Sequence, residues 1–230
     1  MKKRVVALLL AGVLGAVCVA GCGSSKETAV ESTETQEAAP AEETAEQEAE
    51  ETDAETEEEA EDTDVDQQAA DQVAALIDAI YVQERTDDTD KQCADAKAAW
   101  DALTEDQKAL VEGENADPDY FGRDTGDASQ DDPRNQDDIG ENEILVVSFG
   151  TSFNSSRVAD IKGIEDALQE AYPDWSVRRA FTAQIIINHV QAREGEFIDN
   201  MDQALERAVS NGVKNLIVQP THLMHGAEYD

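Results

Sequence analysis

The stretch EILVVSFGTSF, residues 143–153, decides the fold class of this chain. It opens with a continuous apolar and largely β-branched run, Ile144–Val147, which is typical of a strand buried on both faces. A loop of mostly small residues, Ser148–Ser152, follows, and apolar residues then recur at helical spacing until Pro173 ends the pattern. A buried strand, a short loop and an amphipathic helix in this order predict a parallel sheet with helices on its faces.

Two further strand patterns continue the alternation. SVRRAF (176–181) predicts a second strand, and NLIVQ (215–219) predicts a third buried strand. Between them, TAQIIINHVQARE (182–194) and the apolar face from Met201 to Val209 predict two helices. Residues 143–230 are therefore expected to form an α/β lobe with a parallel sheet, and ligands bind such sheets at the carboxyl ends of the strands.

The first loop at that edge is a candidate binding loop. Gly150 allows close backbone approach, and amides near the start of the next helix favour an anion such as a ligand carboxylate. Gly150, Thr151 and Ser152 are therefore candidate ligand-binding residues. An ordinary strand-to-helix turn has the same composition, so that alternative stays open.

The segment PTHLMHGAEYD (220–230) is the second candidate at this edge. His222, His225 and Glu228 are spaced three apart, so on a helix they would share one face. Imidazole and carboxylate together suit a borderline divalent metal, and these three residues are a candidate metal-binding set. Each histidine could equally be a satisfied polar group without a ligand role.

Two segments precede the α/β lobe. Residues 67–112 carry apolar positions at helical spacing and a capping box at Thr104–Gln107, which predict a small helical hairpin with a further short helix. Cys93 and Trp100 are expected in its core. Residues 113–142 are dominated by Gly, Pro, Asp and Asn and are expected to be a linker.

The amino terminus has the pattern of an export signal. Lys2, Lys3 and Arg4 precede a short apolar run, and V-A-G-C ends at Cys22. This ending resembles the lipobox of bacterial lipoproteins, which implies removal of residues 1–21 and acylation of Cys22. The chain is then expected to be exported and lipid-anchored, on the outer face of the cytoplasmic membrane or in the periplasm. An unlipidated secreted form and a plain N-terminal anchor are the alternatives.

Most of the negative charge lies in one segment. The formal net charge is -36, and residues 22–66 supply much of it without a large aliphatic side chain other than valine. Such a segment repels itself and has little to bury, so we expect a disordered acidic tether. The charge also argues against a nucleic-acid partner, because no basic patch is available to meet phosphate.

Several blocks in series resemble one family. ILVVSFGTSF, RRAFTAQIII, VQARE and VQPTHLMHGAEYD are similar, in this order, to the first half of the sirohydrochlorin cobaltochelatases of anaerobic cobalamin biosynthesis. The resemblance covers residues 143–230. It implies two α/β lobes around a tetrapyrrole cleft, with Co²⁺ as a substrate metal inserted into sirohydrochlorin and no organic cofactor.

The resemblance also implies roles for single residues. Glu228 corresponds to a metal-binding glutamate of the first lobe, and His222 to a histidine near the cleft, whereas His225 has no such counterpart. The family's other metal-binding and proton-accepting histidines belong to the second lobe, so no catalytic residue is expected within these 230 residues, which would represent an incomplete enzyme. Self-association into a homo-oligomer remains open.

A second function is compatible with the same residues. Cobalamin ring synthesis is cytoplasmic, whereas the start of this chain predicts export. The alternative is therefore an exported, membrane-anchored lipoprotein that binds a tetrapyrrole or a metal without chelatase activity.

Overall fold

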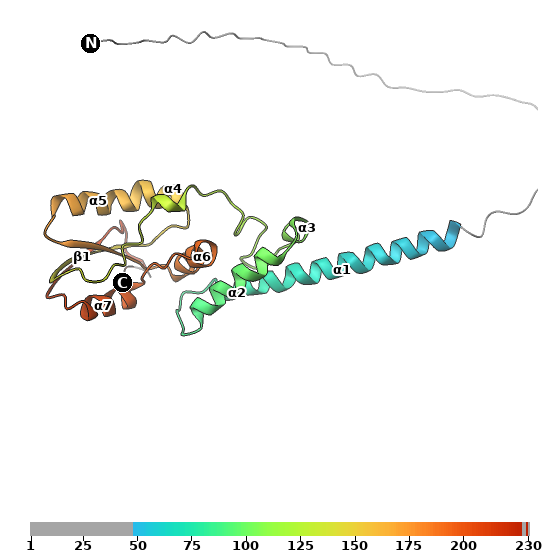
Figure 1. The fold of residues 1–230 in the computed structure, drawn as a ribbon, viewed down its shortest axis with the longest axis horizontal. Coiled ribbons are helices and arrows are strands. Elements are labelled where there is room, and N and C mark those ends of the chain that lie inside the picture. The colour runs from blue at the N-terminus through green and yellow to red at the C-terminus, as the bar shows by residue number, and fades with distance from the viewer. Residues whose placement is uncertain (1–47, 227–228, 230) are drawn as a thin grey trace, which may run out of the picture. The chain divides into compact units, whose positions relative to one another are not determined.

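A three-stranded parallel sheet forms the centre of the α/β lobe (Figure 1). The structure is a computed structural model that describes residues 48–226 and 229, with side chains from residue 63 onward. β1 (Asn142–Ser148) lies in the middle and pairs in parallel with β2 (Ser176–Phe181) and β3 (Asn215–Pro220). The three predicted strands and the parallel α/β class are confirmed.

Helices cover both faces of β1 and β2. Ile144 and Val146 pack with Leu168 of α5 (Lys162–Ala171), whereas Leu145 and Val147 pack with Ala204 of α7 (Met201–Ser210). Since side chains alternate along a strand, β1 is buried on both faces, as its apolar run predicts. Figure 1 shows α5 and α7 on opposite sides of the sheet. The remaining helical elements of the lobe are α4 (Asn154–Ser156), the π-helical segment η2 (Arg157–Ile161) and α6 (Gln184–Glu194).

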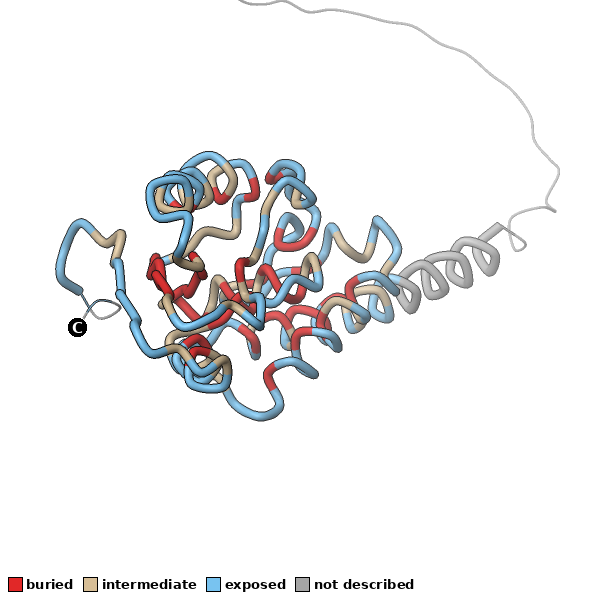
Figure 2. Tube along the Cα trace, turned by 60° about the vertical axis from the view of Figure 1, so that its left-hand side comes forward, coloured by how far each residue is buried: buried red, intermediate tan, exposed pale blue. Residues whose placement is uncertain are grey.

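β3 departs from the sequence prediction of a buried strand. Its residues are exposed or half-buried, and Leu216, Ile217 and Val218 are 37%, 47% and 46% exposed. The reason is its position at the sheet edge, beyond α5 and α7, whose contacts lie over β1 and β2. Figure 2 shows the exposed C-terminal end of the described chain in pale blue, in contrast to the buried strands. The apolar run therefore correctly predicts a strand, but its prediction that other elements bury this strand is wrong.

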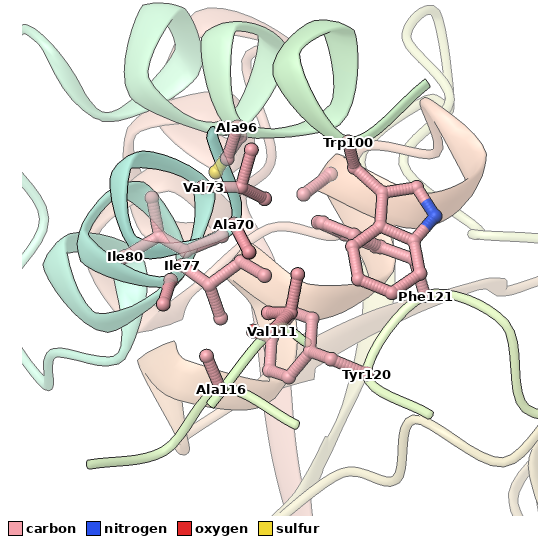
Figure 3. Packing of buried hydrophobic residues seen from close by; sticks show 13 residues of the cluster. Ala70, Val73, Ile77, Ile80, Ala96, Trp100, Val111, Ala116, Tyr120 and Phe121 are labelled. Atoms are coloured by element: carbon pink, nitrogen blue, oxygen red, sulfur yellow. The ribbon is translucent and has the colours of Figure 1, made fainter. Parts of the chain in front are cut away.

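The helical segment has its own core, and that core reaches the lobe. α1 (Glu48–Ile80) and α2 (Thr89–Ala102) bring their apolar faces together, and apolar residues from Val111 to Phe121 pack against them (Figure 3). The short α3 (Glu105–Lys108) lies between and buries no side chain. Cys93 and Trp100 are buried in this core, as expected, and Ala192 of α6 belongs to the same cluster. The capping box at Thr104 and Gln107 is present, so the short third helix begins where the sequence predicts.

Two boundaries differ from the sequence expectations. α1 begins at Glu48, so residues 48–66 of the expected tether are helical in the structure. Alanine and glutamate are strong helix formers, and extending a helix from the packed residues that follow costs little. The expected linker 113–142 ends one residue early, because β1 begins at Asn142. Residues 113–141 are irregular apart from η1 (Ala128–Gln130), but ion pairs hold part of this segment against the lobe.

The amino-terminal predictions lie largely outside the described residues. The expected signal peptide 1–21, Cys22 and residues 23–47 of the tether are not described. Among residues 48–226 and 229, none of the helices combines the length and apolar character needed to cross a membrane.

Candidate functional site

The carboxyl ends of the three strands bring a small set of hydroxyl and imidazole groups together. Ser148 ends β1, Thr182 follows β2, and Thr221 and His222 follow β3. The Thr221 hydroxyl donates to Ser148 Oγ at 2.9 Å, and Thr182 Oγ1 lies 3.2 Å from His222 Nε2. Backbone bonds fix the same residues, because the amides of Thr182 and Thr221 donate to Ser148 O and Val147 O. This edge is where parallel α/β sheets bind ligands.

His222 has a ring nitrogen that is buried and unused. Its Nε2 meets Thr182, whereas Nδ1 is buried and has no hydrogen-bond partner among the described residues. If the threonine hydroxyl accepts from Nε2–H, Nδ1 carries the free lone pair that can take a proton or bind a metal ion. An unpaired buried polar atom costs stability, which makes this nitrogen a candidate ligand contact.

The loop after β1 is held tightly against β2. Gly150 has a φ of +103°, and a Cβ at this position would lie 2.5 Å from the Phe181 ring. Glycine is therefore required here for both backbone conformation and space. The Thr151 hydroxyl accepts from the Phe153 amide at 3.1 Å, and the Ser155 amide donates to Thr125 O at 2.8 Å. Two amides at the start of α4 are thus already used by the protein. The Thr151 and Ser152 carbonyls also accept from Arg157 Nη1 and Arg193 Nη2, so much of the polar backbone of this loop is bonded internally.

The candidate metal set is only partly described. Residues 221–226 form bends rather than a helix, so the spacing of His222 and His225 does not place them on a helical face. Both rings instead contact Tyr229, with ring centroids 5.8 Å and 4.7 Å apart. Glu228 lies outside the described residues. Within the residues that are described, His, Cys, Asp and Glu side chains do not form a group of three that could hold a metal ion.

His189 belongs to the structural core rather than to this site. Its ring stacks on Tyr120 at 4.0 Å, and Nε2 lies 2.7 Å from Tyr120 O. Burial lowers the pKa of His189 to about 4, so the ring is neutral and donates to that carbonyl. It thereby joins α6 to the segment that follows α3.

Sequence comparison finds that the same lobe is similar to a known family. Residues 142–230 match the model of the family described as cobalt chelatase (CbiK). The curated sirohydrochlorin cobaltochelatase of Salmonella typhimurium is 37% identical over 87 residues. This match covers 38% of the present chain and 33% of the Salmonella protein, so the chain spans about a third of that relative. The similarity begins at β1 and leaves out the helical segment.

Thr182 is the site residue that the sequence did not single out. It lies in the stretch TAQ, which the helical pattern assigns to the start of a helix. Only the contact of its hydroxyl with His222 in the structure identifies it as a site residue. The available signal was positional, since Thr182 directly follows a strand that ends at the same sheet edge as β1.

Proposed function

We propose that residues 142–230 act as the first lobe of a sirohydrochlorin cobaltochelatase, which inserts Co²⁺ into the tetrapyrrole for cobalamin biosynthesis. The observation that carries this proposal is the 37% identity to the Salmonella enzyme over the lobe whose edge holds His222. The tetrapyrrole and Co²⁺ are substrates here, and the proposed reaction requires no organic cofactor.

The chemistry sets requirements that these residues can meet in part. Co²⁺ must exchange its water ligands for pyrrole nitrogens, and the macrocycle must release both pyrrole N–H protons. The Nδ1 of His222, unpaired among the described residues, suits proton acceptance or transient metal binding. A carboxylate such as Glu228 suits the same cation, and Gly150, Thr151 and Ser152 suit the edge of the macrocycle. His225, which contacts Tyr229, is a further donor at this edge.

Cobalt insertion tests the proposal directly. The chain alone should insert Co²⁺ into sirohydrochlorin at close to the spontaneous rate, because one wall of a cleft cannot orient metal and macrocycle. A chimera in which the unmatched part of the Salmonella enzyme follows Asp230 should be active. In that chimera, His222→Ala and Glu228→Ala should each reduce kcat/KM by about tenfold or more. Metal insertion is followed by the change in the absorption spectrum of the macrocycle.

The exposed Glu170→Ala on α5 is the matched control and should leave the chimera's rate unchanged. An inactive chimera that binds neither Co²⁺ nor sirohydrochlorin would refute the proposal. A chimera that binds sirohydrochlorin but never inserts cobalt would favour the alternative function, a tetrapyrrole-binding or metal-binding lipoprotein.

We further propose that the chain is exported and lipid-anchored through Cys22, with residues 22–66 as an acidic tether. Its support is the charged and apolar start of the sequence followed by V-A-G-C. Mass spectrometry of the mature protein should find an acylated amino-terminal Cys22. A mature protein that retains Met1, or that begins elsewhere without a lipid, would contradict this.

A further inference from the structure

A cavity of about 460 Å³ opens at the carboxyl end of β2, and its walls come from two parts of the sequence. Phe181, Thr182 and Gln184 belong to the chelatase-like lobe. Gln83, Glu84 and Arg85 belong to the loop 81–88 between α1 and α2, which lies outside the region of family similarity. The cavity adjoins the candidate site, because Thr182 lines it and contacts His222.

Directed hydrogen bonds fix the helical segment against α6. Gln184, Asn188 and Gln191 are buried along α6 and reach the loop 81–88 and its flanking helices. The backbone amide of Gln184 donates to Gln83 Oε1 at 3.1 Å, and the side-chain Nδ2 of Asn188 donates to Ile80 O at 2.8 Å. Gln191 Nε2 donates to Asp90 Oδ1 at 2.7 Å. Because these contacts are directional and at least partly buried, the loop 81–88 holds a defined position beside the cavity.

Arg85 is the cationic side chain among the residues that line this cavity. Its Nη2 donates to Asp90 Oδ2 at 2.6 Å, and its side chain is 20% exposed. Asp90 is itself held by Gln191, so it orients the guanidinium while other donors of that group remain for a ligand. The carboxylates of Glu84 and Asp202 also line the cavity and would repel an anion placed elsewhere along it.

We propose that the loop 81–88 forms an added wall of the substrate cleft, and that Arg85 receives a peripheral carboxylate of the tetrapyrrole. This inference rests on the proposed function and extends it, because it assigns substrate selection to a segment outside the similar lobe. A guanidinium offers planar, charge-assisted donors that suit a carboxylate, and its fixed orientation adds geometric selectivity.

Equilibrium binding of porphyrins to the full chain tests this. Uroporphyrin carries carboxylates on every pyrrole ring, whereas deuteroporphyrin carries fewer, and both quench protein fluorescence when they bind. Arg85→Met should raise the Kd for uroporphyrin about tenfold and change the Kd for deuteroporphyrin much less, as expected for loss of one charge-assisted bond. Arg85→Lys should recover part of the affinity, and Asp202→Asn should tighten uroporphyrin binding.

Two controls separate ligand contact from a displaced loop. Lys91→Met removes a cation of α2 that pairs with Asp95 away from the cavity, and it should leave both affinities unchanged. Cys93 is fully buried and contacts Asn188 O of α6, so its thiol reports whether α2 stays docked. In a Cys18→Ser, Cys22→Ser background, Arg85→Met should leave Cys93 as unreactive toward a thiol reagent as before.

The outcomes are distinct for the two proposals. If the chimera is inactive and binds neither Co²⁺ nor sirohydrochlorin, the proposed function fails and this inference fails with it. If the chimera inserts cobalt into sirohydrochlorin but the unmodified chain does not bind uroporphyrin, the inference is overturned while the proposed function stands. If the unmodified chain binds uroporphyrin and Arg85→Met binds it equally well, the inference is overturned while the proposed function stands. Exposure of Cys93 together with weaker binding of both porphyrins would assign Arg85 a structural role and would also overturn the inference.

Discussion

Arg179→Met should lower the free energy of unfolding by about 3–5 kcal/mol, because it leaves buried carboxylates without their main counter-charge. The Arg179 side chain is fully buried on β2 and binds two carboxylates at once. Its Nε and Nη2 donate to Glu165 of α5 at 2.8 Å each, and Nη1 and Nη2 donate to Asp131 at 2.8 Å and 2.9 Å. Bidentate geometry on both sides makes this a strong interaction despite the cost of burial.

Urea unfolding followed by the fluorescence of Trp175, which packs against the sheet, measures this effect. Lys162→Met is the matched control, since Lys162 pairs with Asp166 in a more exposed position and should cost under about 1 kcal/mol. An equal effect of the two substitutions would contradict the expectation. The double variant Arg179→Met, Glu165→Leu should be more stable than Arg179→Met alone, because it removes a buried carboxylate that has lost its two closest charged donors.

The direction of the pH effect follows from the same geometry. Burial raises the pKa of Glu165 above its usual range even though Arg179 works against it. Loss of Arg179 should raise this pKa further. When the pKa of a carboxyl is higher in the folded protein than in the unfolded chain, the folded protein loses stability as pH rises between the two values. The cost of Arg179→Met should therefore be smaller near pH 5 than near pH 8.

This ion-pair network also explains why the linker is more ordered than its composition suggests. Asp131 accepts hydrogen bonds from both Arg179 and Arg157. Arg134 Nε lies 3.3 Å from Glu165 Oε2, and Arg134 Nη2 lies 2.5 Å from Asp166 Oδ1. Residues 131–134 have no periodicity that would reveal these partners, because each partner is far away in the sequence. Composition thus correctly predicts irregular backbone, whereas the fixed position depends on charges that only the fold brings together.

Local patterns located the strands and most helices of the lobe because each pattern matches a single period. The continuous apolar run of β1 and the helical spacing in α5 and α7 are properties of neighbouring residues, and these elements form where expected. Burial of β3 could not be predicted in the same way. Leu216–Val218 has the composition of a covered strand, and its exposure depends on which elements lie beside it.

The candidate site likewise has one part that local sequence predicts and one part that depends on contacts between distant segments. His222 was recognisable because it follows an apolar strand at the edge where ligands bind, and the structure brings it to Thr182. The docking of α2 on α6 has a weaker signal: Gln184, Asn188 and Gln191 recur at helical spacing on α6, which also carries the apolar run Ile185–Ile187. Polar residues on a buried stripe can indicate a specific partner, but the sequence does not identify which segment it is.

Gly150→Ala should lower the free energy of unfolding by about 2–5 kcal/mol. Two costs add: a residue with a side chain is disfavoured at a φ of +103°, and the new Cβ would lie 2.5 Å from Cδ2 of Phe181. Phe181 is fully buried and packs with Ile187 and Val190 of α6, so its ring cannot move aside without disturbing that cluster. Urea unfolding measures the change in stability.

A second substitution and a control separate the two costs. Phe181→Ala removes the ring atoms that clash, so Gly150→Ala should cost less in the Phe181→Ala background than in the unmodified chain, and a double-mutant cycle measures that coupling. The φ strain should persist as a residual cost of about 1–2 kcal/mol. Gly163→Ala on α5 meets no neighbouring atom and should be neutral or stabilise by up to about 1 kcal/mol. Equal effects at the two glycines would show that neither the backbone conformation nor the contact with Phe181 fixes the loop that leads into the candidate site.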